Sequence, residues 1–466
     1  MVISMDEEGQ YWPSLPCNRV PTGAIQEVGV EELFFSTTDL LGVITAANPV
    51  FVRLSHFGYR QLMGAPHNII RHPRMPGGAF KLMWDTLQSG KPFCAYVDNL
   101  AANGSTYSVF ATITPLGHDA YLSVRSRPMA TSLKTAADSL YDATRPVELA
   151  ARSSGVSARQ AAALGLEHLA GLLVAGGIPS YDEFMWTALA TEMSLRHGAT
   201  TRRDRPNTGD PLSNLFATAG RLGDELQRWT LHQQQLQSAI KALDQALPGL
   251  RDATDAALVA AREFEDAAAG RFAPLLLSLT VWAQMMSEIG DLTVALGADL
   301  ANLRSSSAQT VFRSCLAWLH TDTVTQFANE LLDGVTVPDY DSGAACSALR
   351  LLGQALQEGF AQTHQQEASN ASLAAAAAAK IDEVCGLIDI PRSLIENWKT
   401  TIADTRDSAV ARLLPQVATE VKRADEQLQL LTGLSSDCSA IAEEPPSSSV
   451  DAALGSLLLA IRAVMA

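Results

Sequence analysis

The segment from Pro66 to Trp84 restricts the fold of this chain more than any other stretch of its sequence. Its three prolines and the Gly77-Gly78 pair exclude one long helix and fix the backbone in a few turns. Between these fixed points lie five side chains that can donate hydrogen bonds, carry positive charge or stack: His67, Asn68, Arg71, His72 and Arg74. The segment therefore predicts one wall of a ligand pocket, with Phe80 and Trp84 on an adjoining helix.

Short motifs surround this segment in a fixed order: Ser36 to Asp39, Gly42 to Asn48, Arg71-His72-Pro73, Asn103-Gly104 and Ser123-Val124-Arg125. Together they resemble the PAS domain of the aerotaxis-receptor (Aer) family, whose members hold FAD noncovalently. The resemblance covers about a hundred residues, from Glu31 to Pro128, which is the size of one domain. It implies an α+β PAS domain with a five-stranded antiparallel sheet and short helices.

Local patterns place the elements of this domain. Apolar and β-branched residues predict strands over residues 32–36, 42–46, 93–99, 106–114 and 120–125. Short helices are expected over residues 48–55, 60–63 and 79–89. Asn103-Gly104 is the expected turn between the third and fourth strands, since this pair favours the positive φ angles of tight hairpins.

After Pro128 the sequence becomes rich in Ala and Leu and predicts helix, with breaks at Gly- and Pro-containing runs that include Ile390-Pro391. From Leu222 to Leu250 apolar residues recur in steps of four and three, with Gln233 in the one missing place, which is typical of a coiled-coil or bundle seam. The C-terminal stripe predicts an amphipathic helix docked on the bundle, or alternatively a partner-binding helix. The resulting domains are 1–30 (N-terminal cap), 31–130 (PAS), 131–199 (helical connector), 200–212 (linker), 213–442 (helical bundle or coiled coil), 443–449 (linker) and 450–466 (C-terminal helix).

The net charge of −16 argues against nucleic-acid binding, because contacts to phosphates need basic patches. It falls mainly after Thr131, since residues 31–130 hold eight Lys and Arg against six Asp and Glu. No apolar window reaches the roughly 20 residues of a membrane span. The six cysteines show no disulfide or metal spacing, and the acidic N-terminus lacks a signal peptide, so we expect a cytoplasmic protein.

The resemblance implies that flavin lies between the sheet and the facing helices. The matching positions here are Asn48, Arg71, His72, Phe80, Trp84 and Asn99. Trp84 and His72 would stack on the ring, Asn48 and Asn99 would bond its edge, and Arg71 would meet phosphate. Arg74 stands where the family usually has Asp, and Leu100–Ala102 replaces its usual basic residues. Haem ranks below FAD because residues 79–89 contain no histidine for an axial bond.

Two functions follow. The first is a sensor of redox state or oxygen that binds FAD and relays the change through its helices to an unidentified signalling partner, as a homodimer. The alternative is a PAS interaction module without cofactor on a helical scaffold, in which the pocket is filled by side chains such as Phe80 and His72 caps a turn. The chain also lacks the hairpin-tip sequence of chemoreceptors. Neither catalytic nor metal-ligating residues are expected, because no nucleotide-cyclase, kinase, hydrolase or metal motif is present.

Overall fold

The structure is a computed structural model that describes residues 19–200, 205–268, 273–402, 410–443 and 448–466. Much of the predicted N-terminal cap, residues 1–18, lies outside the described residues. In the described part of the cap, Ile25 forms an isolated parallel bridge with Thr106, and the amide of Gln26 donates to the carbonyl of Thr106 at 2.8 Å.

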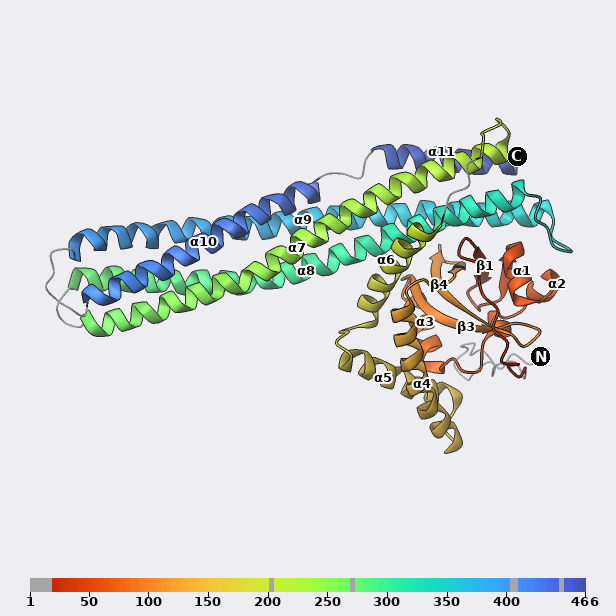
Figure 1. Ribbon diagram of the computed structural model, residues 1–466, viewed down its shortest axis with the longest axis horizontal. Helices are drawn as coiled ribbons and strands as arrows, with labels where there is room; N and C mark the ends of the chain where they lie inside the picture. Colours follow the sequence, from red (N-terminus) through yellow and green to blue (C-terminus); the bar gives the residue numbers. More distant parts are fainter. Residues whose placement is uncertain (1–18, 201–204, 269–272, 403–409, 444–447) are drawn as a thin grey trace. The chain divides into compact units, whose positions relative to one another are not determined.

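The first domain has a single five-stranded antiparallel sheet in the order β2-β1-β5-β4-β3, which confirms the predicted fold class (Figure 1). Its strands are β1 (Leu33–Asp39), β2 (Ile44–Ala47), β3 (Phe93–Leu100), β4 (Thr106–Leu116) and β5 (Ala120–Ser126). Between β2 and β3 lie α1 (Pro49–Ser55), α2 (Tyr59–Leu62), the 3-10 helix η1 (His67–Ile70) and α3 (Gly77–Gln88). The β3–β4 turn contains Gly104 at φ +83°, as the Asn-Gly pair predicts.

Successive side chains along each strand point to opposite sides of the sheet, so the sheet has two different faces. On one face Phe34 stacks on Phe51 of α1 at 5.8 Å between ring centroids. On the other face Phe35 meets Phe327 edge-on at 5.2 Å, and Cys94 lies against Met185. Both faces are therefore covered, so the sheet is a central layer rather than a half-exposed one.

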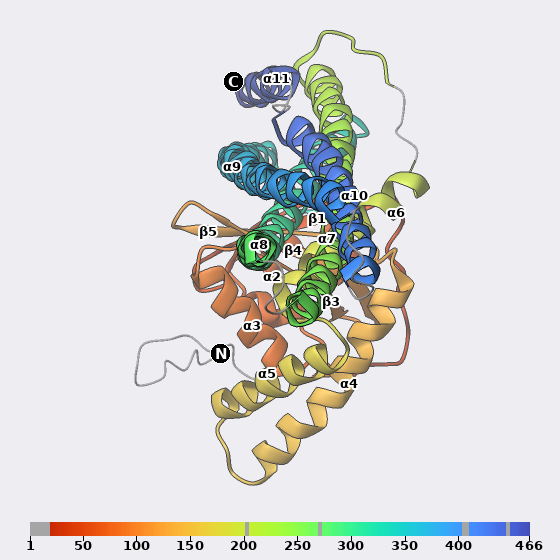
Figure 2. The ribbon, with the colours of Figure 1, turned by 90° about the vertical axis from the view of Figure 1, so that its left-hand side faces the viewer.

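Eight helices follow the sheet among the described residues. They are α4 (Thr131–Ser153), α5 (Ala158–Ala175), α6 (Tyr181–Ala199), α7 (Pro211–Ala268), α8 (Ala273–Leu332), α9 (Ser342–Ile402), α10 (Val410–Glu443) and α11 (Ser448–Met465). Helices α4 and α5 form a hairpin that packs on α3, and both ribbon views show this arrangement (Figures 1 and 2). The chain separates into two compact units, one of residues 1–230, 311–363 and 447–466 and one of residues 231–310 and 364–446.

The predicted helical seam is buried. Its apolar positions from Leu222 to Leu250 are each at most 7% exposed, and Gln233 is buried among them. In the second unit, the seam residues from Leu236 onward join a core that also draws on α8, α9 and α10. The steps of four and three thus identify the inward face of α7 correctly.

Two sequence expectations for the helices meet different outcomes. The predicted break at Ile390-Pro391 is wrong, since α9 continues through it to Ile402. The C-terminal helix docks within the first unit, as expected: Leu457 and Ile461 are buried, and a Cβ at Gly353 of α9 would lie 3.2 Å from Ile461 Cδ1. In the described part of the chain, every helix is too short or too polar to cross a membrane.

Candidate functional site

A cavity of about 560 Å³ opens between the sheet and the helices that face it. This volume lies within the range of small-molecule sites, roughly 300 to 1,000 Å³. Its walls come from the β1–β2 turn, η1, α3 and the strands β3, β4 and β5. The residues that matter most below are His67, Arg71, Phe80, Trp84, Asn99, Tyr121, Ser123 and Arg125.

Arg71 lies at the end of η1 and spreads its guanidinium over the ring of Phe80, with its central carbon 3.9 Å from the ring centroid. One Nη2 hydrogen bond, of 3.3 Å, goes to the carbonyl of Met75. Burial lowers the pKa of Arg71 to about 10, so the group stays charged at neutral pH. The cavity wall therefore includes one buried cation held flat against an aromatic ring.

Arg125 supplies a second buried cation on β5. It donates to Ser36 Oγ at 3.1 Å and contacts Nε2 of His67, whose ring stacks on Phe51 at 6.0 Å. Burial lowers the pKa of His67 well below its usual value, and the positive charge of Arg125 lowers it further. His67 is therefore neutral, and its Nε2 acts as an acceptor for Arg125.

Three polar atoms on the cavity wall are buried without a hydrogen-bond partner in the described residues. They are Nε of Arg71, Nδ2 of Asn99 and Oγ of Ser123. Unsatisfied buried polar groups cost roughly 1 to 3 kcal/mol each, so their grouping around one cavity indicates a missing partner. Two of the three are donors only, and the third is a hydroxyl, so the group that completes them must offer acceptors.

Aromatic rings form the remaining wall. Trp84 of α3 meets Tyr121 of β5 edge-on, with 5.8 Å between ring centroids. At Gly42, in the β1–β2 turn, φ is +75° and an added Cβ would lie 3.1 Å from Cη2 of Trp84. A glycine is required here both for the backbone conformation and for the approach of the indole.

Four of the six residues predicted for cofactor binding line this cavity, namely Arg71, Phe80, Trp84 and Asn99. Asn48 and His72 do not line it. Asn48 is fully buried and caps α1, with Oδ1 accepting from the amides of Phe35 and Phe51 at 3.1 and 3.4 Å. His72 accepts from the amide of Arg74 at 3.1 Å through Nδ1, which is the turn-capping alternative.

Arg74 also points away from the cavity. It pairs with Asp98 at 3.1 Å and with Asp142 at 2.8 Å, and Asp138 lies 3.7 Å away. Its charge is neutralised by these three carboxylates. Arg74 is therefore not a substitute for the basic residues that are missing at Leu100–Ala102.

His67, Tyr121, Ser123 and Arg125 also line the cavity. The sequence placed His67 on the predicted wall segment without a role in cofactor binding, and the other three were not among the predicted site residues. A signal for three of them exists in the sequence: positions 121, 123 and 125 alternate along β5, so they must share one face of the sheet. His67 is harder to predict, because its direction depends on the turn of η1.

The residues of this cavity fit a flavin ring. The ring presents carbonyl and nitrogen acceptors, which Asn99, Ser123 and Arg71 can satisfy, and a flat aromatic surface that Trp84 and Phe80 can contact. Among the described residues, no group of three or more His, Cys, Asp or Glu side chains is arranged to hold a metal ion. The aromatic walls and the three unpartnered polar atoms favour a planar organic ligand that offers acceptors.

Comparison with known proteins places the similarity in this first domain. The chain is 44% identical over 96 residues to the aerotaxis receptor of Escherichia coli, covering 20% of this chain and 19% of that protein. It is 32% identical over 81 residues to the nitrogen fixation regulatory protein of Klebsiella pneumoniae, covering 17% and 16%. The predicted resemblance to aerotaxis receptors is thus confirmed for the N-terminal domain, and the chain spans less than a fifth of either relative.

Other comparisons add little to this assignment. A solved fungal LOV domain photoreceptor is 21% identical and covers 23% of this chain and 81% of that chain, with a TM-score of 0.19. No protein-family model matches the chain.

Proposed function

We propose that this chain is a signal-transduction protein whose PAS domain binds FAD and senses redox state or oxygen. The observation that carries the proposal is the group of three unpartnered polar atoms, on Arg71, Asn99 and Ser123, around one aromatic-lined cavity. The 44% identity to an aerotaxis receptor over this domain supports the same conclusion. We further propose that the protein is cytoplasmic, non-enzymatic and homodimeric, and that its helices pass the signal to a protein partner.

In this proposal each wall residue has a defined task. Asn99 and Ser123 hydrogen-bond the ring edge, Trp84 and Phe80 contact its faces, and Arg71 provides positive charge. A bound flavin supplies reversible electron transfer, which changes the charge and hydrogen bonding that these residues face. The neutral His67 accepts from Arg125 and so holds this cation in place beside the ring.

A path from the wall to the helices runs along β5. Ser123 and Arg125 lie on this strand. Three and four residues beyond its end, the amides of Met129 and Ala130 donate to the buried carboxylate of Glu192 at 2.7 and 3.0 Å. Tyr96 of β3 donates to the same carboxylate at 2.8 Å. A change in hydrogen bonding at the wall thus has a short mechanical route to α4 and α6.

The first test is an absorption spectrum of the purified full-length chain, followed by reconstitution with FAD. Flavin bands that disappear on reduction are expected. A chain that remains without flavin after reconstitution would leave the cofactor-free interaction module as the function.

Site variants sharpen this test. Trp84→Ala and Ser123→Ala should both weaken FAD binding, the second by about fivefold, since a neutral hydrogen bond contributes about 1 kcal/mol. Ser126→Ala is the matched control, because Ser126 is buried on the same strand but does not line the cavity. If Trp84→Ala bound FAD as tightly as the parent, the cavity would not be the binding site.

A further inference from the structure

Arg125 of β5 is a buried cation without a carboxylate partner in the described residues. It is 4% exposed and lines the larger cavity, and its side-chain hydrogen bonds go to two neutral groups, Oγ of Ser36 at 3.1 Å and Nε2 of His67. The guanidinium also lies 5.7 and 5.3 Å from the ring centroids of Phe34 and Phe51. These contacts orient the guanidinium, but none of them supplies a negative charge.

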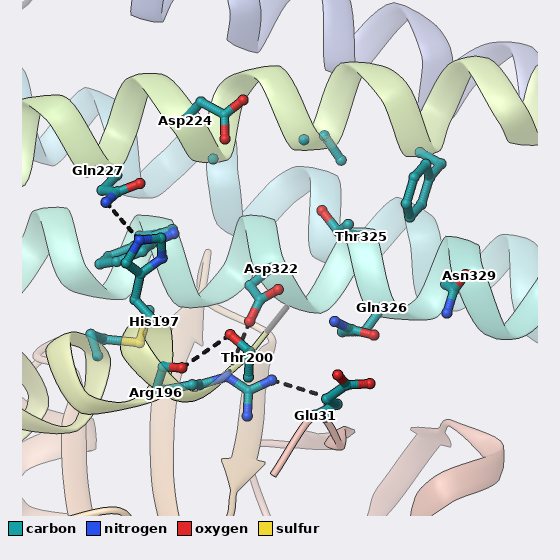
Figure 3. Close-up of a pocket in the computed structure, with 16 residues that line it drawn as sticks. Glu31, Arg196, His197, Thr200, Asp224, Gln227, Asp322, Thr325, Gln326 and Asn329 are labelled. Atoms are coloured by element: carbon teal, nitrogen blue, oxygen red, sulfur yellow. Dashed lines mark hydrogen bonds and ion pairs between the residues drawn. The ribbon is translucent and has the colours of Figure 1, made fainter. Parts of the chain in front are cut away.

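A second buried arginine in the first compact unit shows how such a charge is balanced by an ion pair. Arg196 of α6 is 3% exposed and lines a smaller cavity of about 140 Å³. Its Nε donates to the carboxylate of Asp322 at 3.1 Å (Figure 3), and its Nη atoms donate to the carbonyls of Val30 and Glu31. Arg196 therefore has an ionic partner inside the protein, whereas Arg125 has none among the described residues.

The charge of Arg71, which lines the same cavity as Arg125, is partly offset. Burial lowers the pKa of Arg71 and the charge of Arg145 adds to this effect, but the carboxylate of Glu148 opposes it. At Arg125, burial lowers the pKa to about 10, and the opposing group is the phenol of Tyr107, which is neutral. Arg125 thus stays charged at neutral pH. An unpaired charge in the protein interior is costly, so a negative group on a ligand would be attracted strongly to this arginine.

Two parts of FAD can bring a negative charge, namely its phosphates and its ring after reduction. Ser123 and Arg125 are two positions apart on β5, so their side chains leave the same face of the sheet, and both line the cavity. In the proposed site, Ser123 bonds the edge of the ring. This placement favours the ring as the source of the charge that Arg125 meets.

We propose that Arg125 makes the cavity bind the reduced, anionic ring of the flavin more tightly than the oxidised, neutral ring, and so raises the reduction potential of the bound cofactor. Reduction adds two electrons and one proton to the neutral ring, and the product carries one negative charge. In the experiment, dithionite supplies the electrons and is oxidised to sulfite, and water supplies the proton. This inference rests on the proposed function, since it needs a bound flavin.

The test is the midpoint potential of FAD bound to the full-length chain, measured by dithionite titration against a reference dye. Arg125→Gln should weaken the binding of reduced FAD at least about tenfold more than that of oxidised FAD, because a charge-assisted hydrogen bond is lost. A tenfold change in this ratio lowers the potential by about 30 mV for two electrons. Arg125→Lys keeps the charge and should retain most of the parent potential.

Arg74→Gln is the matched control for loss of a positive charge from the same domain. Arg74 does not line the cavity, and Asp98 and Asp142 pair with it at 3.1 and 2.8 Å. Its replacement should leave the potential unchanged. A fall in potential equal to that of Arg125→Gln would show that overall charge, and not the position of Arg125, sets the potential, and would overturn the proposal.

A second measurement needs no variant. If Arg125 keeps the reduced ring anionic, each pair of electrons brings one proton, so the parent potential should change by about 30 mV per pH unit between about pH 5.5 and 6.5. Free reduced flavin takes up a second proton in weakly acidic solution, which gives a slope approaching about 60 mV per pH unit. Nearby groups do not add a proton here, since burial lowers the pKa of His67 and raises that of Tyr107, and Lys81 pairs with Asp85 at 2.9 Å.

Three results would overturn the proposal: a parent potential retained in FAD-bound Arg125→Gln, an equal loss of affinity for oxidised and reduced FAD, or a parent slope of about 60 mV per pH unit. The second of these would assign Arg125 to a phosphate. If Arg125→Gln does not retain FAD, the slope of the parent decides. A parent chain that binds no FAD would refute the proposed function itself, and this result differs from the other three.

Discussion

Replacing Glu330 by Gln should stabilise the protein at alkaline pH and remove a large part of its pH dependence. Glu330 lies on α8, and both of its oxygens are 3.3 Å from Nδ2 of Asn48. Burial raises the pKa of Glu330 from 4.5 to about 8, and the negative charge of Glu32 adds to the rise, whereas Asn48 and Arg53 oppose it. Gln keeps an acceptor for Asn48 but cannot ionise.

The direction in which stability changes with pH follows from proton binding by Glu330. Between pH 4.5 and 8 the folded state holds a proton at Glu330 that the unfolded chain has released, so stability is complete below pH 4.5 and falls as pH rises towards 8. At 1.36 kcal/mol per pKa unit, the upper limit of the loss is about 5 kcal/mol, and entry of water would reduce it to about 2 kcal/mol. Tyr340 lies close enough for its pKa to be raised by the Glu330 charge, but it titrates above this window.

The measurement is urea unfolding of the parent and the variant at several pH values from 5 to 8.5, with circular dichroism as the signal. The variant should gain about 2 kcal/mol over the parent at pH 8 and almost nothing at pH 5. Glu167→Gln, at an exposed position of α5, is the control and should follow the parent. Parallel pH profiles for the parent and Glu330→Gln would refute the reasoning.

Three further changes test how α3 is held. Gly78→Ala should cost about 1 to 3 kcal/mol, because its Cβ would lie 2.4 Å from the amide nitrogen of Leu166 on α5. Gly171→Ala on α5 is the matched control, because an added Cβ there meets no atom within 4 Å, and it should stabilise the protein by up to about 1 kcal/mol. Thermal unfolding of both variants measures the two changes in stability, and a similar change in both would contradict the close contact of Gly78 with α5. Glu148→Ala should cost about 2 kcal/mol in urea unfolding, since its carboxylate binds the amides of Gly77 and Gly78 at 2.7 Å each; no loss would mean that water replaces it.

The elements of the first domain could be predicted because their boundaries are local. Asn103-Gly104 fixes the β3–β4 turn, and alternating apolar residues fix which side chains face the core. The capping role of Asn48 was also readable, since Asn followed by Pro49 is a common start of a helix. The resemblance to a flavin-binding family instead predicted that Asn48 contacts a ligand.

Proline was a poor guide to helix ends in the long helices. Pro146 and Pro248 lie inside α4 and α7, and Pro391 lies within α9. Proline removes one hydrogen bond and costs about 3 kcal/mol in a helix interior, which packing along a helix of this length can offset. The sequence shows the local cost but not the packing.

Contacts between distant residues could not be predicted at all. Glu148 caps α3 from 70 residues away, and Glu192 binds the start of α4 from more than 60 residues away. Each is a single carboxylate in a helix, which from sequence alone is typical of a solvated face. Only the fold reveals that Glu148 is 2% exposed and Glu192 is 3% exposed.

These distant carboxylates connect the cavity to the helices that follow it. Helix α3 contributes Phe80 and Trp84 to the cavity wall, and its first two amides rest on Glu148 of α4. Arg145 of α4 also donates to Glu148, at 3.0 Å, and to the carbonyl of Pro73, at 3.2 Å. These bonds join α3 and the proline-rich segment to α4. A ligand that moves α3 must therefore either break the two charge-assisted hydrogen bonds to Glu148 or carry α4 with it. Because α3 and α4 are joined in this way, the α4–α5 hairpin is the element that we expect to respond first.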